Sequence, residues 1–141
     1  MSNNGTTLRE SAKKGEVMTF NLQDLAGEDY CYLTTTGRIT GRPHTVEIWF
    51  GLHNQTLYIL SGGMDRSDWV KNALRYPRVS IKIRNSVFDG QARLVKDEEE
   101  DALARRLLFE KYSPRDNDLE EWARTSLPMA FDLTSSNAPE G

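Results

Sequence analysis

Apolar and polar residues alternate along several short stretches of the chain. In residues 44–53, every second residue from Val46 to Leu52 is apolar, so these side chains share one face of an extended segment. A polar turn at residues 53–55 separates this segment from an apolar run at 56–61, and the two predict a β-hairpin. The same reasoning predicts strands at residues 30–36, 79–84, 87–96 and 127–133.

A helical period replaces the alternation at three places. In residues 65–76, apolar residues recur four positions apart, as Trp69 with Ala73 and Val70 with Leu74 do. We expect Ala73 and Leu74 to lie in the core.

Two further helices are predicted near the C-terminus. Asp97 and Glu100 form a capping box at the start of a helix over residues 97–112. A shorter helix follows at residues 118–125 and carries Trp122.

These elements predict a mainly β protein with helices, of the α+β class. One helix lies between the third and fourth of six strands, and the helical pair precedes the last strand. Because most strand connections are short, the sheet is expected to be antiparallel, and six short strands close most economically into a small barrel. We expect one domain over residues 16–134, a disordered arm at 1–15 and a flexible tail at 135–141.

Composition narrows the possible functions. The 141 residues suit one domain, and the formal net charge of −3 argues against a nucleic-acid-binding protein. Residues 37–90 carry eight Lys or Arg and four Asp or Glu, whereas residues 97–123 carry four and ten. A basic middle in an acidic chain favours an anionic ligand, although charges that merely solvate two surfaces explain the same counts.

Other residue types exclude further classes. One cysteine and two histidines predict no metal site and no internal disulfide. Cys31 has no base nearby in sequence and is interpreted as a buried thiol. No apolar run reaches the roughly 20 residues that a membrane span needs, and we expect a cytoplasmic protein without an integral membrane segment.

Two segments carry candidate chemistry. Residues 37–43 combine glycines, a proline and two arginines, which suits a loop that binds a phosphate, although a solvated hairpin has the same composition. Residues 61–69 run from a strand through Gly62 and Gly63 towards a helix N-terminus, whose free amides attract anions. Asp65 and Asp68 argue against an anion there, and a capped helix is the alternative interpretation.

The three tryptophans and the absence of catalytic motifs are both compatible with a protein that binds a cofactor. Trp49, Trp69 and Trp122 either stack on a planar ligand or belong to the core. The chain has no nucleophile elbow, phosphate-binding lysine loop or spaced pair of carboxylates. Basic loops and aromatics without an acid–base set suit an enzyme whose cofactor carries the reaction.

Five segments, in this order and spacing, resemble the deazaflavin-dependent nitroreductase family. They are Leu-Thr-Thr-Thr-Gly-Arg-Ile-Thr-Gly-Arg-Pro at 33–43, Trp-Phe at 49–50, Leu-Tyr-Ile-Leu-Ser-Gly-Gly at 57–63, Arg-Ser-Asp-Trp-Val-Lys-Asn at 66–72 and Pro-Arg-Val at 77–79. The resemblance implies a six-stranded split β-barrel of the flavin-reductase type and a hydride transfer from reduced coenzyme F420 to a small-molecule quinone, nitro or activated alkene acceptor. It leaves open a monomer or a homodimer.

The resemblance also implies the site residues. The first loop would hold the phosphate and glutamate tail of the cofactor, through Thr36, Gly37, Arg38, Thr40, Gly41, Arg42 and Pro43. The segment after the third strand would surround the ring, through Ser61, Gly62, Gly63, Met64, Arg66, Ser67, Trp69 and Asn72. Trp49, Tyr112 and Trp122 are candidates for the acceptor side, and Tyr112 or Ser61 is a candidate proton donor beside water.

Two alternatives stay open at this point. Ile39 stands where family members often carry a basic residue, which favours a shorter cofactor and an FMN-dependent split-barrel reductase. The missing acid–base set is equally compatible with a non-enzymatic protein that binds a cofactor or a hydrophobic ligand.

Overall fold

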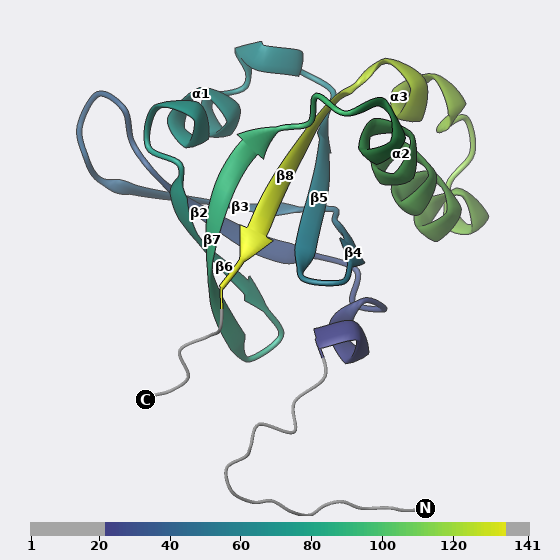
Figure 1. Ribbon diagram of the computed structural model, residues 1–141, viewed down its shortest axis with the longest axis horizontal. Helices are drawn as coiled ribbons and strands as arrows, with labels where there is room; N and C mark the ends of the chain where they lie inside the picture. The colour runs from purple at the N-terminus through teal and green to yellow at the C-terminus, as the bar shows by residue number, and fades with distance from the viewer. Residues whose placement is uncertain (1–21, 135–141) are drawn as a thin grey trace, which may run out of the picture.

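The computed structural model describes residues 22–134, which form one curled antiparallel sheet with helices at two sides (Figure 1). The predicted arm at 1–15 and tail at 135–141 lie outside the described residues. After a short 3-10 turn, η1 (Leu22–Leu25), seven strands follow: β2 (Cys31–Thr36), β3 (Pro43–Ile48), β4 (Gly51–His53), β5 (Thr56–Ser61), β6 (Arg78–Ile83), β7 (Ser86–Leu94) and β8 (Leu127–Leu133). The α+β class and the antiparallel barrel-like sheet are confirmed.

The sheet order is β3-β2-β6-β7-β8-β5-β4. Strands β3 and β4 are consecutive in the chain and lie at opposite edges of the sheet, so the sheet curls back on itself like a split barrel. The prediction of one strand over residues 44–53 was therefore wrong, and the sheet has seven strands where six were expected.

The break between β3 and β4 lies at Phe50 and is held from a helix. The Phe50 N–H donates to the Tyr112 hydroxyl at 3.1 Å. The Phe50 carbonyl oxygen accepts a hydrogen bond from Lys111 Nζ at 2.9 Å. Because these side-chain contacts bond the backbone of a fully buried residue, the chain can leave one edge of the sheet and join the other.

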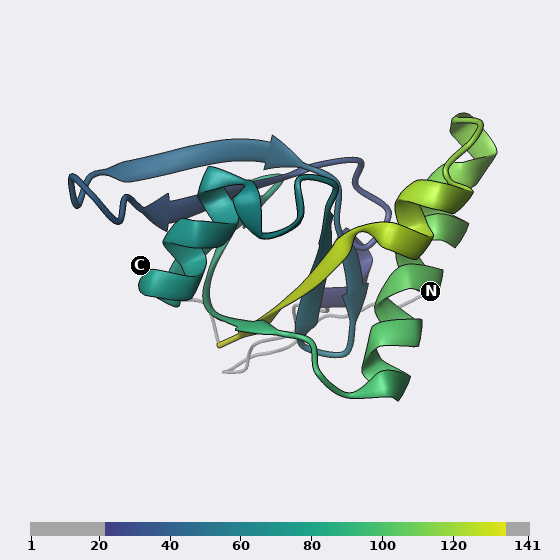
Figure 2. The same ribbon diagram turned by 90° about the horizontal axis from the view of Figure 1, so that it is seen from above.

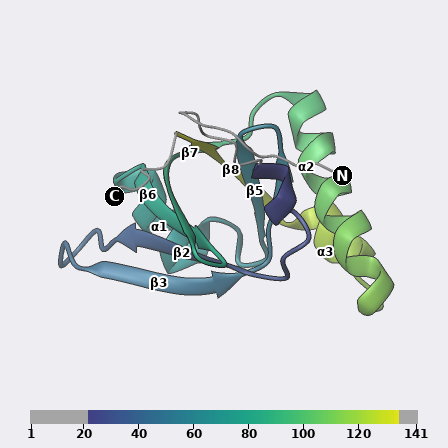
Figure 3. The same ribbon diagram turned by 90° about the horizontal axis from the view of Figure 1, so that it is seen from below.

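The helices lie on two sides of the sheet. They are η2 (Met64–Arg66), α1 (Asp68–Arg75), α2 (Glu98–Tyr112), η3 (Ser113–Arg115) and α3 (Glu120–Thr125). Helix α1 lies beside the β2–β3 hairpin, which projects beyond the rest of the sheet, whereas α2 and α3 lie together on the other side (Figure 2). Figure 3 shows the same separation from the opposite direction.

The predicted helix at 65–76 is divided at Ser67, whose backbone is extended (φ −65°, ψ 139°). Ala73 is fully buried as expected, but Leu74 is 42% exposed, so its placement in the core was wrong. Only one face of this eight-residue helix packs on the sheet, and Leu74 lies off that face. The predicted start of α2 is confirmed, since the Asp97 carboxylate accepts from the Glu100 N–H at 2.9 Å.

The core consists of two clusters. The first fills the inside of the curl and contains Cys31, whose burial raises its pKa to about 12, as expected for an inert thiol. The second lies beneath α2 and includes Tyr58, Leu108 and Tyr112.

An ion-pair network ties the first turn of α2 to the sheet. Arg93 donates to Glu100 at 2.7 and 2.8 Å and to Asp132 at 2.7 Å. Tyr58 donates its hydroxyl hydrogen to Glu100 at 2.6 Å. The hydrogen bonds from Arg93 lower the pKa of Glu100 to about 2.

Candidate functional site

The loop between β2 and β3 is a tight, hydrogen-bonded turn. The Gly37 N–H donates to the Arg42 carbonyl at 2.7 Å, and the Gly41 N–H donates to the Gly37 carbonyl at 2.8 Å. Gly41 has a φ of 78°, a conformation that other residues rarely adopt. A Cβ atom at Gly37 would lie 2.6 Å from His44 Nε2, so glycine lets the histidine ring approach the turn.

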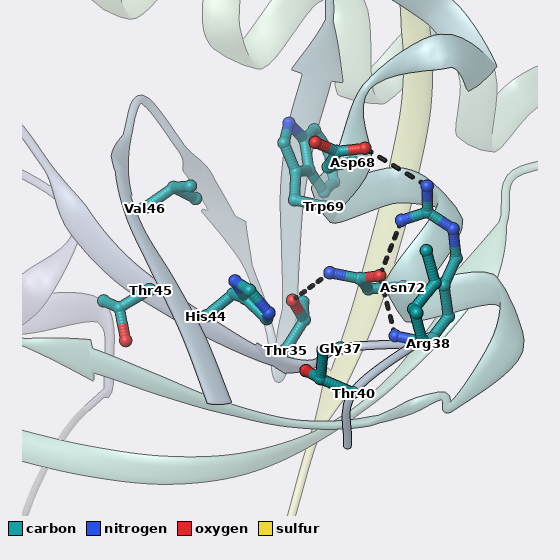
Figure 4. A pocket seen from close by; sticks show the side chains of 11 residues that line it. Thr35, Gly37, Arg38, Thr40, His44, Thr45, Val46, Asp68, Trp69 and Asn72 are labelled. Atoms are coloured by element: carbon teal, nitrogen blue, oxygen red, sulfur yellow. Dashed lines mark hydrogen bonds and ion pairs between the residues drawn. The ribbon is translucent and has the colours of Figure 1, made fainter. Parts of the chain in front are cut away.

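Arg38 is fastened to α1 by a buried amide. Asn72 is 3% exposed, and its Oδ1 accepts from the Arg38 backbone N–H at 3.1 Å and from Arg38 Nη1 at 2.9 Å. The Asn72 amide nitrogen donates to Thr35 Oγ1 at 3.3 Å. Arg38 Nη2 also lies 3.2 Å from Asp68 Oδ1 (Figure 4). A guanidinium has five N–H groups, so others remain for a ligand.

A cavity of about 420 Å³ lies between this loop, β3 and the start of α1 (Figure 4). The predicted cofactor residues that line it are Gly37, Arg38, Thr40, Trp69 and Asn72. Lining residues that were not among them are Thr35, Ile39, His44, Thr45, Val46 and Asp68. Two signals for them are present in the sequence: Thr35 is a polar residue on the buried face of a strand, and Asp68 lies four positions before Asn72, on the same helical face.

The remaining predicted residues lie outside the lining of this cavity. Thr36, Gly41, Arg42 and Pro43 belong to the same hairpin. The other predicted residues lie at the end of β5 and in its connection to α1. They are Ser61, Gly62, Gly63, Met64, Arg66 and Ser67.

Two serines, Ser61 and Ser67, stabilise the turn that connects β5 to α1. The Ser61 hydroxyl donates to the Met64 carbonyl at 2.8 Å and lies 3.1 Å from the Ser67 hydroxyl. A Cβ atom at Gly63 would collide with the Ser67 hydroxyl oxygen. Met64 itself has a φ of 59°. The glycine and the serine pair therefore shape a sharp turn that leads directly into the helix lining the cavity.

The three aromatic residues predicted for the acceptor side lie together. The rings of Trp49 and Tyr112 are stacked with centroids 4.1 Å apart, and Trp122 meets Trp49 edge-on at 5.6 Å. A Cβ atom at Gly62 would lie 3.8 Å from Trp122 Cδ1. The connection from β5 to α1 thus reaches from this aromatic cluster at one end to the cavity at the other.

The hydroxyls of both candidate proton donors, Tyr112 and Ser61, are hydrogen-bonded to other groups of the protein. Tyr112 is fully buried, and its hydroxyl donates to the Asp29 carbonyl at 2.8 Å while accepting from the Phe50 N–H. Desolvation is the main cause that raises the pKa of Tyr112 to about 12. Burial lowers the pKa of the neighbouring Lys111 to about 8. Ser61 is 2% exposed, with its hydrogen directed at a carbonyl.

Residues 22–134 contain no helix that is long and apolar enough to cross a membrane. The same part of the chain contains no group of three His, Cys, Asp or Glu side chains arranged to hold a metal ion.

Comparison with known proteins identifies the family. Among solved structures, an F420H2-dependent reductase is 23% identical, with a TM-score of 0.60 over 75% of this chain and 94% of that chain. A domain-swapped dimer is 24% identical, with a TM-score of 0.60 over 75% and 80% of the two chains. HutZ, the heme storage protein from Vibrio cholerae, is 17% identical, with a TM-score of 0.63 over 83% and 89%.

These structural likenesses show a shared fold, and a fold that also occurs in a heme storage protein does not by itself define an activity. The match that carries the assignment is to the model of the F420H(2)-dependent quinone reductase family, which covers residues 7–133. It agrees with the resemblance seen in the order of the sequence motifs. The chain therefore belongs to the F420H2-dependent quinone reductase family, and it is an oxidoreductase that uses coenzyme F420.

Proposed function

We propose that this reductase passes a hydride from reduced F420 to a small planar acceptor, with a quinone preferred over a nitro compound or an activated alkene. When bound, the reduced coenzyme supplies the hydride. The name of the family supports a quinone, and the aromatic cluster of Trp49 and Trp122 supports a planar acceptor. The observation that carries the proposal is Arg38, held at a cavity by a buried asparagine.

The cavity fits the charged part of the coenzyme. A phosphate needs N–H donors in a fixed arrangement, and Arg38 offers a guanidinium whose Nη1 is bonded to Asn72, which also accepts from the Arg38 backbone N–H. Thr40 adds a hydroxyl to the lining, and the ring of Trp69 adds an aromatic surface. Besides the Asp68 carboxylate, which is paired with Arg38, the lining offers a cation, hydroxyls and an aromatic ring, and these groups suit a ligand that is both anionic and planar.

The connection from β5 to α1 is proposed to contact the ring of the coenzyme. Gly62, Gly63 and Met64 are exposed, and two glycines without side chains let a flat ligand approach the backbone. Ser61 and Ser67 are proposed to keep this turn in shape. Arg66, exposed at the end of η2, is proposed to extend the positive charge along the same surface.

The acceptor is proposed to lie against the partly buried faces of Trp49 and Trp122. Tyr112 is proposed to support Trp49 from behind rather than to deliver a proton, since its hydroxyl is bonded to two backbone groups. Ser61 is bonded in a similar way, so we propose that solvent supplies the proton of the product. The contribution of the protein is then the orientation of the two reactants.

The test compares two arginines of the same loop. Arg38→Ala removes the cation from the cavity, whereas Arg42→Ala makes the same change at an exposed position outside its lining. In a fluorescence titration with F420, we expect Arg38→Ala to weaken binding by about 10-fold or more, because hydrogen bonds to charged groups contribute about 1.5–3 kcal/mol. Arg42→Ala should change the affinity by about twofold at most.

Turnover is then measured with reduced F420 and, in separate reactions, a soluble quinone, a nitroarene and an activated alkene. Faster reduction of the quinone supports the proposed acceptor. An unchanged affinity in Arg38→Ala would remove this cavity from the cofactor site. A parallel titration with FMN distinguishes the alternative cofactor.

Two further proposals concern the oligomeric state and the cellular location of the protein. We propose a cytoplasmic enzyme that is a monomer or a homodimer, and the domain-swapped dimer among the similar structures supports the second possibility. Light scattering of the purified protein distinguishes the two masses.

A further inference from the structure

Asp68 places a carboxylate in a cavity that is proposed to bind an anion. It is the first residue of α1, its side chain is 84% exposed, and it lines the cavity beside Trp69 and Asn72 (Figure 4). Its Oδ1 lies 3.2 Å from Arg38 Nη2. We propose that Asp68 is an internal competitor of the cofactor phosphate for Arg38, and that it sets the affinity for phosphate-bearing ligands. This inference rests on the proposed function.

The ion pair is not needed to position Arg38. Asn72 already binds both the backbone N–H and Nη1 of Arg38, and Asn72 is buried whereas Asp68 is exposed. Exposed pairs of this kind contribute little to folding stability. The main effect of the Asp68 carboxylate is therefore to place a negative charge where an incoming ligand approaches Arg38.

The phosphate and the Asp68 carboxylate compete because both would bind the same atom, Arg38 Nη2. A phosphate that bonds to Arg38 Nη2 must displace the Asp68 carboxylate or lie next to it, and two like charges at that distance repel. A neutral ligand in the same cavity meets no such repulsion. Asp68 therefore lowers the affinity for phosphate-bearing ligands and leaves the affinity for neutral ones unchanged.

The competition also favours one kind of anion. A phosphate can bond to the guanidinium through two oxygens at once, and the strength of this bidentate contact offsets the loss of the ion pair. An anion that makes a single contact gains less and is excluded more effectively. Asp68 is in this sense a specificity-determining residue of the Arg38 site.

The test is Asp68→Asn, with Asp89→Asn as the matched control. Asp89 undergoes the same change of charge, is also paired with an arginine, since its Oδ2 lies 3.5 Å from Arg78 Nη2, and lies outside the lining of the cavity. Each variant is titrated with F420 and with the deazariboflavin part of the coenzyme alone (the riboside), which lacks both the phosphate and the glutamate tail. We expect Asp68→Asn to bind F420 about two- to fivefold tighter at low salt, the range that an exposed ion pair corresponds to.

The gain should shrink as the salt concentration rises, because screening weakens the repulsion that the substitution removes. The affinity for the riboside should stay the same in both variants, and Asp89→Asn should bind both ligands like the unchanged protein.

Three results would overturn the inference: no gain for F420 in Asp68→Asn, an equal gain in Asp89→Asn, or an equal gain for the riboside. The Arg38→Ala titration separates this failure from that of the proposed function. If Arg38→Ala loses affinity and Asp68→Asn gains none, only the competition is wrong. If Arg38→Ala binds F420 normally, the site itself is wrong.

Discussion

Replacing Tyr112 by phenylalanine removes one oxygen atom at the place where the chain passes from β3 to β4. In the native protein this oxygen accepts from the Phe50 N–H at 3.1 Å, and its hydrogen is donated to the Asp29 carbonyl at 2.8 Å. Phe50 is fully buried, so in the variant its N–H has neither this acceptor nor water. The Phe50 carbonyl keeps its bond to Lys111.

The expected magnitude follows from these contacts. A buried donor left without a partner costs about 1–3 kcal/mol, whereas the exposed Asp29 residue can exchange its lost bond for water. We therefore expect the free energy of unfolding to fall by about 1–3 kcal/mol, measured by urea denaturation. The melting temperature should fall by about 4 °C for each kcal/mol. The stacked ring of Trp49 keeps its partner, because phenylalanine retains the aromatic face.

The control is Tyr30→Phe, which deletes the same atom from a side chain that is 45% exposed and should leave the stability unchanged. Turnover of Tyr112→Phe is measured well below its melting temperature, across a range of pH. A supporting role predicts an unaltered pH profile. A turnover that collapses while stability is retained would refute this reasoning and identify Tyr112 as the proton donor.

Two further predictions concern the ion-pair network and the hairpin loop. The pKa of Glu100 is lowered from 4.5 to about 2 in the folded protein, so its stabilising contribution is complete above pH 4.5 and is lost as the pH falls towards 2. Glu100→Gln should lower the free energy of unfolding at pH 7 by about 1–3 kcal/mol and flatten its acid dependence, whereas equal acid sensitivity of the two proteins would show that Arg93 does not stabilise this carboxylate. Gly37→Ala should weaken F420 binding several-fold, because its Cβ would displace the His44 ring that lines the cavity. Adding His44→Ala should restore part of that affinity, and a Gly37→Ala protein that binds normally would contradict the proposed crowding.

The sequence was sufficient for most strands because their signals are local. Alternation and turn residues located β2, β5, β6, β7 and β8 within a few residues. The division of residues 44–53 was not visible, since the alternation continues unbroken through Phe50. What ends β3 is a pair of side chains about sixty positions away, Lys111 and Tyr112, and such contacts leave no local pattern.

The candidate site shows the same limit. Glycines, arginines and motif order pointed to the loop and to α1, and the structure brings Arg38 and Asn72 into contact across 34 positions. The sequence ranked Arg38 and Arg42 as equals, because both follow a glycine. Only the packing of α1 against the hairpin shows that Arg38 lines the cavity and that Asp68 is its neighbour.

The most direct measurement of the central claim is a crystal structure of this protein with F420 bound. The account predicts the phosphate within hydrogen-bonding distance of the Arg38 guanidinium, in the cavity between the hairpin loop and α1, with the ring along residues 61–67. A coenzyme bound elsewhere, with the Arg38–Asp68 pair intact and the cavity filled only by water, would contradict it.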